Sequence, residues 1–208
     1  MPKSQPHIFS SNARWAFALI LWVGVASLLA SCGDFPFQTR EAEPPATAGS
    51  NPVVPLTPGD VLSNLVLSVN TRDAVLYGEN FTNNFTFKPD PSDSVEVEKN
   101  FPGAYANWTL FVEEGVADFL LDPIRCSYAN LRFEDELIVD FTDSTYLLQE
   151  NYFLILKHAS FVEYRGQVRF FMRKLPDGYW YIERWVDYIA VDQYPTWGRL
   201  KGETRARM

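Results

Sequence analysis

Cys32 is the residue whose type and setting point most directly to chemistry. It lies in the stretch SLLASCGD, residues 27–34, directly after an apolar run, and a cysteine thiol is a nucleophile that can carry a covalent group. The run WAFALILWVGVASLLA, residues 15–30, follows Lys3 and Arg14 with no acidic residue before it. A positive head, an apolar core and small residues at its exit are typical of a secretory signal. The run is shorter than the roughly twenty residues of a spanning helix, so a permanent anchor helix is the second interpretation.

The four residues Leu29-Ala30-Ser31-Cys32 resemble the bacterial lipobox. The resemblance implies that lipid is attached to the Cys32 thiol and that a peptidase removes residues 1–31 as a lipoprotein signal peptide. Several acyl chains, each contributing about 0.8 kcal/mol per buried CH₂, anchor a protein stably to a membrane. Gly33 puts Asp34 one position too late for the inner-membrane retention signal of enteric bacteria, so we expect the outer membrane, facing the periplasm, where one exists. The plainer alternative is a small apolar residue near an ordinary cleavage site.

The composition is typical of a secreted globular domain on a tether. The chain has 208 residues, of which 47% are hydrophobic and 15% aromatic, and this favours a filled core over disorder. After removal of the signal, enough chain remains for one domain and a tether. The formal net charge of −8 becomes −10 when Lys3 and Arg14 are removed, so nucleic acid is not an expected partner. Lipidation leaves only Cys126, which excludes an intrachain disulfide.

The remaining chemical groups are few and poorly spaced for catalysis. His158 is the only histidine after the signal, and a lone histidine at a strand end is more often exposed or bonded than catalytic. Cysteines and histidines do not have metal-ligand spacing, and FEDELIVD, residues 133–140, is better interpreted as a solvated acidic edge than as a cation site. Glycine-rich phosphate loops and G-x-S-x-G turns are absent from the sequence. We therefore expect no metal and no cofactor.

Residues 32–56 are rich in proline and small residues and predict an extended tether, followed by a domain over residues 57–201. In the first half of that domain we expect a helix over residues 57–73, a short helix over 74–80, a short strand over 81–90 and a helix over 105–121. Thr57 is the expected cap of the first helix, and Asp60 completes a capping box with it. These elements form a helical layer before the main sheet.

Strand patterns dominate after residue 127. Residues 127–133, 136–141 and 152–158 predict strands, and residues 167–188 predict a hairpin that turns at Pro176-Asp177-Gly178. In the first arm of that hairpin, apolar side chains alternate with Arg169 and Arg173. One face of the antiparallel sheet is therefore expected to be wet and the other covered.

The second arm of the hairpin contains an irregularity. Trp185 and Asp187 have the opposite parity to Trp180 and Ile182, and a β-bulge near Glu183-Arg184 would return them to the inner face. The expected fold class is α+β, with N-terminal helices packed on a strongly curved antiparallel sheet that forms a cone. The charged tail, residues 202–208, is expected to fray.

The order of these elements, with DGYWYIERWVD at residues 177–187 and YPTWGRLK at 194–201, resembles the nuclear transport factor 2-like superfamily. This cystatin-like, SnoaL-like group includes ketosteroid isomerases and polyketide cyclases, and the chain is most similar to its small bacterial members. The resemblance covers about residues 57–201. It implies a conical cavity between sheet and helices, which enzymes of the group use and many other members do not. It also implies that the sheet can form a homodimer, which the wet face does not exclude.

Enzymes of this superfamily place an aspartate or histidine in the cone as general base, with tyrosine or a protonated acid as oxyanion donor. The resemblance therefore implies Asp187 as the base, with His158 and either Tyr152 or Tyr128 as companions. The alternative is that Asp187 only bonds backbone groups at the bulge. The aromatic residues expected to line a pocket or fill the core are Trp108, Tyr128, Tyr152, Trp180 and Trp185. Trp197 is expected to pack back onto the domain, so that WGRLK closes the base of the cone; a binding rim with Tyr188 and Tyr194 is the alternative.

Two functions follow from these observations. The first is a membrane-tethered, non-enzymatic module that binds an unidentified small molecule or envelope protein, and the long tether with no convergent catalytic set favours it. The second is a small-molecule isomerase, cyclase or dehydratase that uses Asp187 as general base. A cavity beside Asp187 distinguishes the two.

Overall fold

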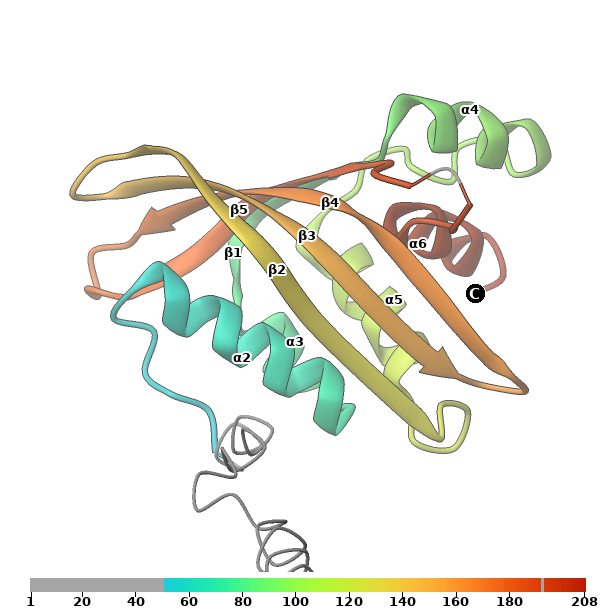
Figure 1. The fold of residues 1–208 in the computed structure, drawn as a ribbon, viewed down its shortest axis with the longest axis horizontal. Helices are drawn as coiled ribbons and strands as arrows, with labels where there is room; N and C mark the ends of the chain where they lie inside the picture. The colour runs from blue at the N-terminus through green and yellow to red at the C-terminus, as the bar shows by residue number, and fades with distance from the viewer. Residues whose placement is uncertain (1–50, 192) are drawn as a thin grey trace, which may run out of the picture. The chain divides into compact units, whose positions relative to one another are not determined.

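The computed structural model describes residues 51–191 and 193–208. The predicted signal, the lipidation site Cys32 and most of the tether lie outside the described residues. These described residues form one compact unit, which Figure 1 shows as a curved sheet with helices. Across the part of the chain that the structure describes, no helix combines the length and the apolar character that crossing a membrane requires.

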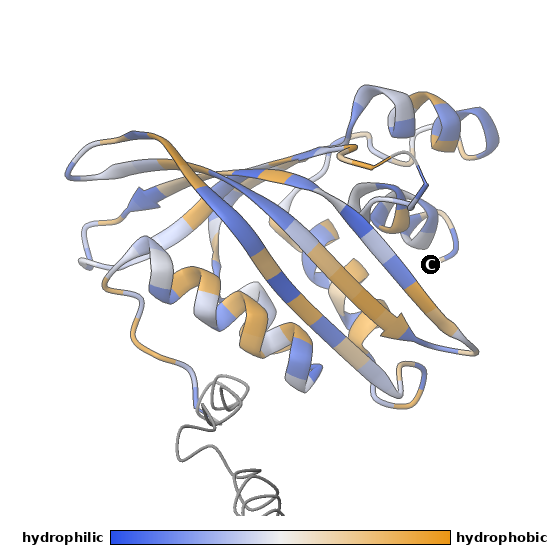
Figure 2. Cartoon of the chain, viewed as in Figure 1, coloured by the Kyte–Doolittle hydropathy of each residue, from blue (hydrophilic) through white to orange (hydrophobic). Residues whose placement is uncertain are grey.

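In the part of the chain that the structure describes, five strands form one sheet in the order β1-β5-β4-β3-β2. β1 pairs with β5 in parallel, whereas every other neighbouring pair is antiparallel. The strands span Phe81–Lys88 (β1), Tyr128–Phe141 (β2), Thr145–Lys157 (β3), Phe161–Lys174 (β4) and Trp180–Tyr188 (β5). Hydropathy alternates along the first part of β2 (Figure 2), where the sheet is covered on one face, whereas the second part of the strand is exposed.

Within the described residues, five helices accompany the sheet: α2 (Pro58–Thr71), α3 (Ala74–Gly78), α4 (Pro91–Asn100), α5 (Leu110–Leu121) and α6 (Trp197–Arg205). α2 contacts β2 and β5, α5 contacts β1, and α6 contacts β4 and β5. α4 and α6 lie side by side (Figure 1). The expected capping box is present, because the Thr57 side chain accepts from the Asp60 backbone and the Asp60 side chain accepts from the Thr57 backbone.

The predicted bulge in β5 is confirmed. Phe171 pairs with Arg184 but its neighbour Met172 pairs with Ile182, so that Glu183 is the extra residue. The bulge turns Trp185 and Asp187 inward, where both are 0% exposed. The expected fold class, α+β with helices packed on a curved sheet, is also confirmed, although the parallel pairing of β1 with β5 makes the otherwise antiparallel sheet mixed.

The structure corrects the predictions for two helices. The helix expected over residues 105–121 begins at Leu110, because Asn107 has a positive φ of 52° and breaks the helical path before it. α4 was not predicted at all. Asp90 accepts from the backbone of Ser92 and Pro91 occupies the first turn, so a helix begins shortly after β1 ends.

Two further predictions concern the ends of elements. The strands expected over residues 127–133 and 136–141 are one strand, β2, with register shifts between Glu134 and Leu137 and between Ile138 and Asp140. The expectation that residues 202–208 fray is wrong as far as Arg205, because α6 continues to that residue. Gly202 and Thr204 are buried in this helix, which anchors it.

Candidate functional site

The interior of the cone is filled by aromatic side chains. Trp185, Trp197 and Trp108 are at most 5% exposed. The ring centroids of Trp185 and Trp197 lie 4.6 Å apart, edge to face, which is a favourable arrangement for two aromatic rings. The cavity that remains between α5, β3 and α6 has a volume of about 10 Å³, which is about one water molecule. A substrate-sized space is therefore not present there.

Asp187 joins three elements by hydrogen bonds. Its Oδ2 accepts from the Gly198 backbone N–H at 2.7 Å and from the Tyr152 hydroxyl at 3.2 Å. The Tyr152 hydroxyl in turn accepts from the Trp197 backbone N–H at 2.8 Å. Oδ1 has no hydrogen-bond partner among the described residues. Asp187 therefore ties β5 to β3 and to the start of α6.

Burial is the main cause of the pKa shifts of Asp187 and Tyr152. Burial raises the pKa of Asp187 to about 7, opposed by the Gly198 hydrogen bond and by the charge of Lys201. Burial and the Asp187 charge hold the pKa of Tyr152 well above its ordinary value. An acid that titrates near neutrality beside a tyrosine is the pair that the superfamily resemblance predicted for proton transfer.

Access to Asp187 is closed by the backbone of α6. A Cβ atom added to Gly198 would lie 2.5 Å from Asp187 Oδ2 and 3.1 Å from Asp187 Cβ, so the glycine allows helix and carboxylate to touch. Asp187 does not line the cavity of about 10 Å³. The carboxylate is thus covered by backbone, but its hydrogen bonds are to Gly198 of α6 and to the Tyr152 hydroxyl and not to backbone groups at the bulge.

A buried ion pair lies next to this site, and the sequence analysis missed it. Lys201 Nζ lies 2.5 Å from Glu113 Oε1, and both side chains are 1% exposed. The Tyr77 hydroxyl donates to the same oxygen, and Trp108 Nε1 donates to Oε2 at 2.7 Å. Every strong acceptor of Glu113 therefore has a partner, as burial of a charge requires.

Aromatic rings surround the ammonium of Lys201. Its Nζ lies 3.3 Å from the ring centroid of Trp185 and 4.5 Å from that of Phe87, within the range of a cation–π interaction. Burial lowers the pKa of Lys201, against the attraction of Glu113. The sequence feature that indicates the burial of Lys201 is its spacing from Trp197, because residues one helical turn apart share a face of the helix.

The other predicted site residues do not join Asp187. His158 Nε2 lies 3.2 Å from the carbonyl oxygen of Leu120, and it makes no hydrogen bond with Asp187 in the described structure. The prediction for Tyr128 is wrong, because this residue is 43% exposed. Its neighbour Ala129 points inward and so directs Tyr128 to the outer face, where it packs on Phe161. Trp108, Tyr152, Trp180 and Trp185 are buried as expected.

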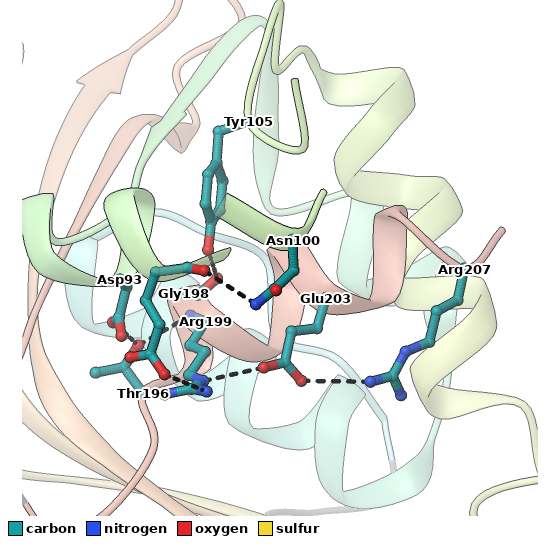
Figure 3. A network of polar contacts seen from close by, with 9 residues as sticks. Asp93, Asn100, Tyr105, Thr196, Gly198, Arg199, Glu203 and Arg207 are labelled. Carbon is teal, nitrogen blue, oxygen red and sulfur yellow. Dashed lines mark hydrogen bonds and ion pairs between the residues drawn. The ribbon is translucent and has the colours of Figure 1, made fainter. Parts of the chain in front are cut away.

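A polar network outside the core fixes the start of α6 (Figure 3). Thr196 Oγ1 donates to Asp93 Oδ2 on α4 at 2.6 Å. Arg199 forms ion pairs with Glu96 of α4 at 2.9 Å and with Glu203 of α6 at 3.0 Å. These contacts hold α6 over Asp187 from the solvent side.

A larger pocket, of about 800 Å³, lies outside the cone between α3, α5, the start of β1 and residues 52–55. Val53 is fixed there by Asn64, which accepts from its N–H at 2.8 Å and donates to its C=O at 2.7 Å. The described end of the predicted tether is therefore bound to the domain. Within residues 51–191 and 193–208, no group of three or more His, Cys, Asp and Glu side chains is placed to hold a metal ion.

Comparison with known proteins bears on the fold. A scan against family models finds no match, and a search of curated proteins finds no relative. The chain is similar to a solved structure from Novosphingobium aromaticivorans described as a candidate aromatic ring hydroxylase, with a TM-score of 0.50, 13% identity, and 64% of this chain and 86% of that chain covered. At that identity the similarity shows a shared fold alone.

Two other solved structures have lower scores. A protein of unknown function from Mycobacterium tuberculosis has a TM-score of 0.49 and 13% identity, with 72% of this chain and 83% of that chain covered. A nuclear transport factor 2-like superfamily protein from Salmonella enterica has a TM-score of 0.46 and 11% identity, with 64% and 89% covered.

Proposed function

We propose that this chain is a lipid-tethered, non-enzymatic binding domain of the bacterial cell envelope. The observation that carries the proposal is the closed interior of the cone, where a cavity of about 10 Å³ remains and the backbone of Gly198 lies against the Asp187 carboxylate. Binding of a ligand or partner then takes place on the outside of the domain.

The proposed location rests on the sequence alone. The positive head, the apolar run and the motif ending in Cys32 favour a lipidated protein whose mature chain starts at that cysteine. Gly33 and Asp34 favour the outer membrane over the inner membrane where both exist. The membrane, through the lipid on Cys32, is the first proposed partner, and an envelope protein or a small molecule is the second.

The enzymatic alternative is a small-molecule isomerase, cyclase or dehydratase that uses Asp187 as general base. The observation in its favour is the pKa of about 7 for a buried carboxyl that is bonded to the Tyr152 hydroxyl. This alternative requires α6 to leave the cone, because Gly198, Trp197 and Lys201 of that helix occupy the space beside the carboxylate.

The location is tested by intact mass and fractionation of wild type and Cys32→Ala. We expect lipid mass on wild type, which partitions with membranes, and no lipid mass on Cys32→Ala. An unlipidated and uncleaved wild-type chain would overturn the proposal.

The function is tested by native mass spectrometry of the full Cys32→Ala chain with a steroid and an aromatic polyketide as probes of the cone. We expect neither probe to bind. A one-to-one complex whose formation or turnover is lost in Asp187→Asn would favour the enzyme instead.

A further inference from the structure

The outer face of the sheet, formed by the side chains of β3, β4 and β5 that point away from the helices, differs in charge from the rest of the chain. Along β4 these side chains alternate with the buried Val168, Phe170 and Met172. The outer face carries five basic and two acidic side chains, although the whole chain has a formal net charge of −8. The basic ones are Lys157, Arg165, Arg169, Arg173 and Arg184, and the acidic ones are Glu163 and Glu183. Positive charge is therefore concentrated on this face.

The two acidic side chains of the outer face are already paired. Glu163 Oε1 lies 2.7 Å from Arg165 Nη2, and Glu183 Oε1 lies 2.9 Å from Arg173 Nε. Within residues 51–191 and 193–208, every ion pair involves residues other than Arg169 and Arg184. The charges of these two arginines are therefore not neutralised by an acidic side chain of the described structure.

Aromatic rings hold both guanidinium groups in place. The guanidinium carbon of Arg184 lies 3.8 Å from the ring centroid of Phe171, and that of Arg169 lies 5.3 Å from the ring centroid of Tyr188. Arg169 Nε also donates to Gln149 Oε1 at 2.7 Å, which leaves its terminal N–H groups without an acceptor in the described structure. A guanidinium group that is stacked on a ring is pre-organised, so less conformational freedom is lost when its N–H groups bind an anion.

The sheet register makes these two arginines neighbours. Phe171 of β4 pairs with Arg184 of β5, and Arg169 of β4 pairs with Val186 of β5. Arg169 and Arg184 are therefore diagonal neighbours on one face, with about 7–8 Å between such positions. Like charges at this separation repel each other, and bound anionic groups would offset that repulsion. The outer face is thus complementary in charge to a surface that carries several anionic groups.

Phosphate groups in a lipid surface fit these two arginines. A guanidinium group donates two parallel hydrogen bonds to a phosphate, and lipid headgroups present many phosphates in one layer. Arginine and tyrosine side chains, such as Arg169 and its neighbour Tyr188, combine an apolar body with a polar end and therefore suit the headgroup region. A second copy of this chain would bring the same unneutralised arginines to the contact, so charge disfavours a dimer through this face.

The proposed anchor favours a lipid surface over a free ligand. Residues 33–50 lie between Cys32 and the first described residue, Asn51, and a chain of this length spans at most about 60 Å. Lipid on Cys32 would therefore keep the outer face within reach of the headgroups. Such a link raises the effective concentration of the second contact, so even a weak contact can form.

We propose that the outer face docks on the phosphate groups of the membrane that anchors the chain, with Arg169 and Arg184 as the residues that bind them. This inference rests on the proposed lipid anchor, because it names the part of the domain that contacts the proposed membrane partner. The helices then face away from the membrane, and the cone and its Asp187 take no part in the contact.

The test is quenching of a site-specific fluorophore by a quencher-bearing lipid. The lipidated chain is labelled either at Gln167→Cys, on the outer face, or at Val75→Cys, an exposed position on α3, since Cys126 is fully buried and Cys32 would carry the lipid. Each protein is reconstituted into vesicles of phosphatidylethanolamine and phosphatidylglycerol that contain the quencher. We expect at least threefold stronger quenching at position 167 than at position 75, and we expect the difference to shrink with added salt.

Arginine variants of the chain labelled at position 167 show whether the docking depends on the proposed residues. Arg169→Gln and Arg184→Gln should each reduce the quenching at least twofold. The matched control is Arg207→Gln, which removes one charge from an exposed arginine that pairs with Glu203 beyond the sheet; it should be quenched like the parent chain. Circular dichroism and the thermal midpoint identify a variant that fails to fold, and the other arginine variant then carries the test.

Three outcomes would overturn the inference: equal quenching at positions 167 and 75, quenching that neither arginine variant changes, or a dimer in native mass spectrometry whose contact protects position 167 from the lipid quencher. Failure of the proposed location is recognised separately, by an intact mass without lipid on Cys32. In that case, flotation of the unlipidated chain with the same vesicles still compares wild type, Arg169→Gln and Arg207→Gln. A loss of flotation in Arg169→Gln alone supports docking by the outer face, and equal flotation of all three contradicts it.

Discussion

Lys201 and Glu113 form an ion pair in the centre of the domain, with 2.5 Å between Nζ and Oε1 and 1% exposure of each side chain. Removing two charges from water is costly, and the attraction between them offsets that cost only when their remaining polar atoms are also bonded. Tyr77 and Trp108 provide those bonds on the Glu113 side. The pair is therefore coupled, and the loss of one member should be more harmful than the loss of both.

Replacing Lys201 by methionine leaves the charge of Glu113 buried and unpaired. We expect Lys201→Met to lower the free energy of unfolding by about 3–5 kcal/mol. The double variant Lys201→Met/Glu113→Gln should recover most of this loss, since glutamine can bond both Tyr77 and Trp108. Urea unfolding at pH 7 measures each value, and additive losses would contradict the coupling.

The control for that experiment is Arg207→Met. Arg207 pairs with Glu203 at 3.6 Å, with side-chain exposures of 64% and 30%. Exposed pairs contribute about 0–1 kcal/mol, so this variant should unfold almost like wild type.

Asp187→Asn should change how stability depends on pH. The folded-state pKa of Asp187 is about 7, above the unfolded value of about 3.9. Between these values the folded state binds more protons, so the contribution of Asp187 is fully present below about pH 4 and is lost as pH rises through about 7. Asparagine does not titrate, so the stability of the variant relative to wild type should rise by a few kcal/mol from pH 4 to pH 8, at about 1.4 kcal/mol per pKa unit.

Unfolding curves of both proteins at several pH values between 4 and 8 check this expectation. Glu150, whose pKa burial also raises to about 7, titrates in both proteins and cancels in the difference. A difference that is constant with pH would show that Asp187 is ionised throughout.

Gly198→Ala tests the contact that closes the cone. The added Cβ would lie 2.5 Å from Asp187 Oδ2, and overpacking of this kind costs about 1–3 kcal/mol. Gly59→Ala is the control, since its nearest atom would be 3.8 Å away and alanine favours a helix by up to about 1 kcal/mol. Thermal unfolding should therefore shift in opposite directions for the two variants, and equal shifts would mean that Gly198 does not touch Asp187.

Asn64→Ala tests how residues 52–55 are held. The variant loses both hydrogen bonds to Val53, each contributing about 0.5–1.5 kcal/mol. We expect a small loss of stability together with faster proteolytic cleavage at residues 51–56, followed by mass spectrometry. Ser63→Ala, which removes an exposed side-chain bond to Gly59, should leave cleavage unchanged.

The inner face of β5 could be predicted because it depends on local parity. Trp185 and Asp187 follow Trp180 and Ile182 with one residue too many, and a bulge is the simplest arrangement that buries all the apolar side chains. The start of α2 was predictable for the same kind of reason, since a cap and its reciprocal acid are three residues apart.

The ion pair and α4 could not be predicted with the same rules. Lys201 belongs to a charged C-terminal stretch, and such stretches are usually exposed to solvent. Its partner Glu113 lies 88 residues earlier in the sequence, and local sequence patterns do not predict contacts between residues so far apart. For α4 the local signal is short, because only Asp90 as a cap and Pro91 in the first turn mark the start of the helix.

Because β1 pairs with β5 and not with its neighbours in sequence, the sheet can be completed only after β5 has been synthesised. A ribosome that has released the chain only as far as Lys174 has made β1 and the β2–β3–β4 meander, but not the strand that joins them. Trp197 and Lys201, which fill the cone and neutralise Glu113, emerge later still. The nascent chain therefore keeps an open sheet edge until β5 is made and an uncompensated carboxylate until α6 is made, so a chain that stops before Trp197 does not complete the core.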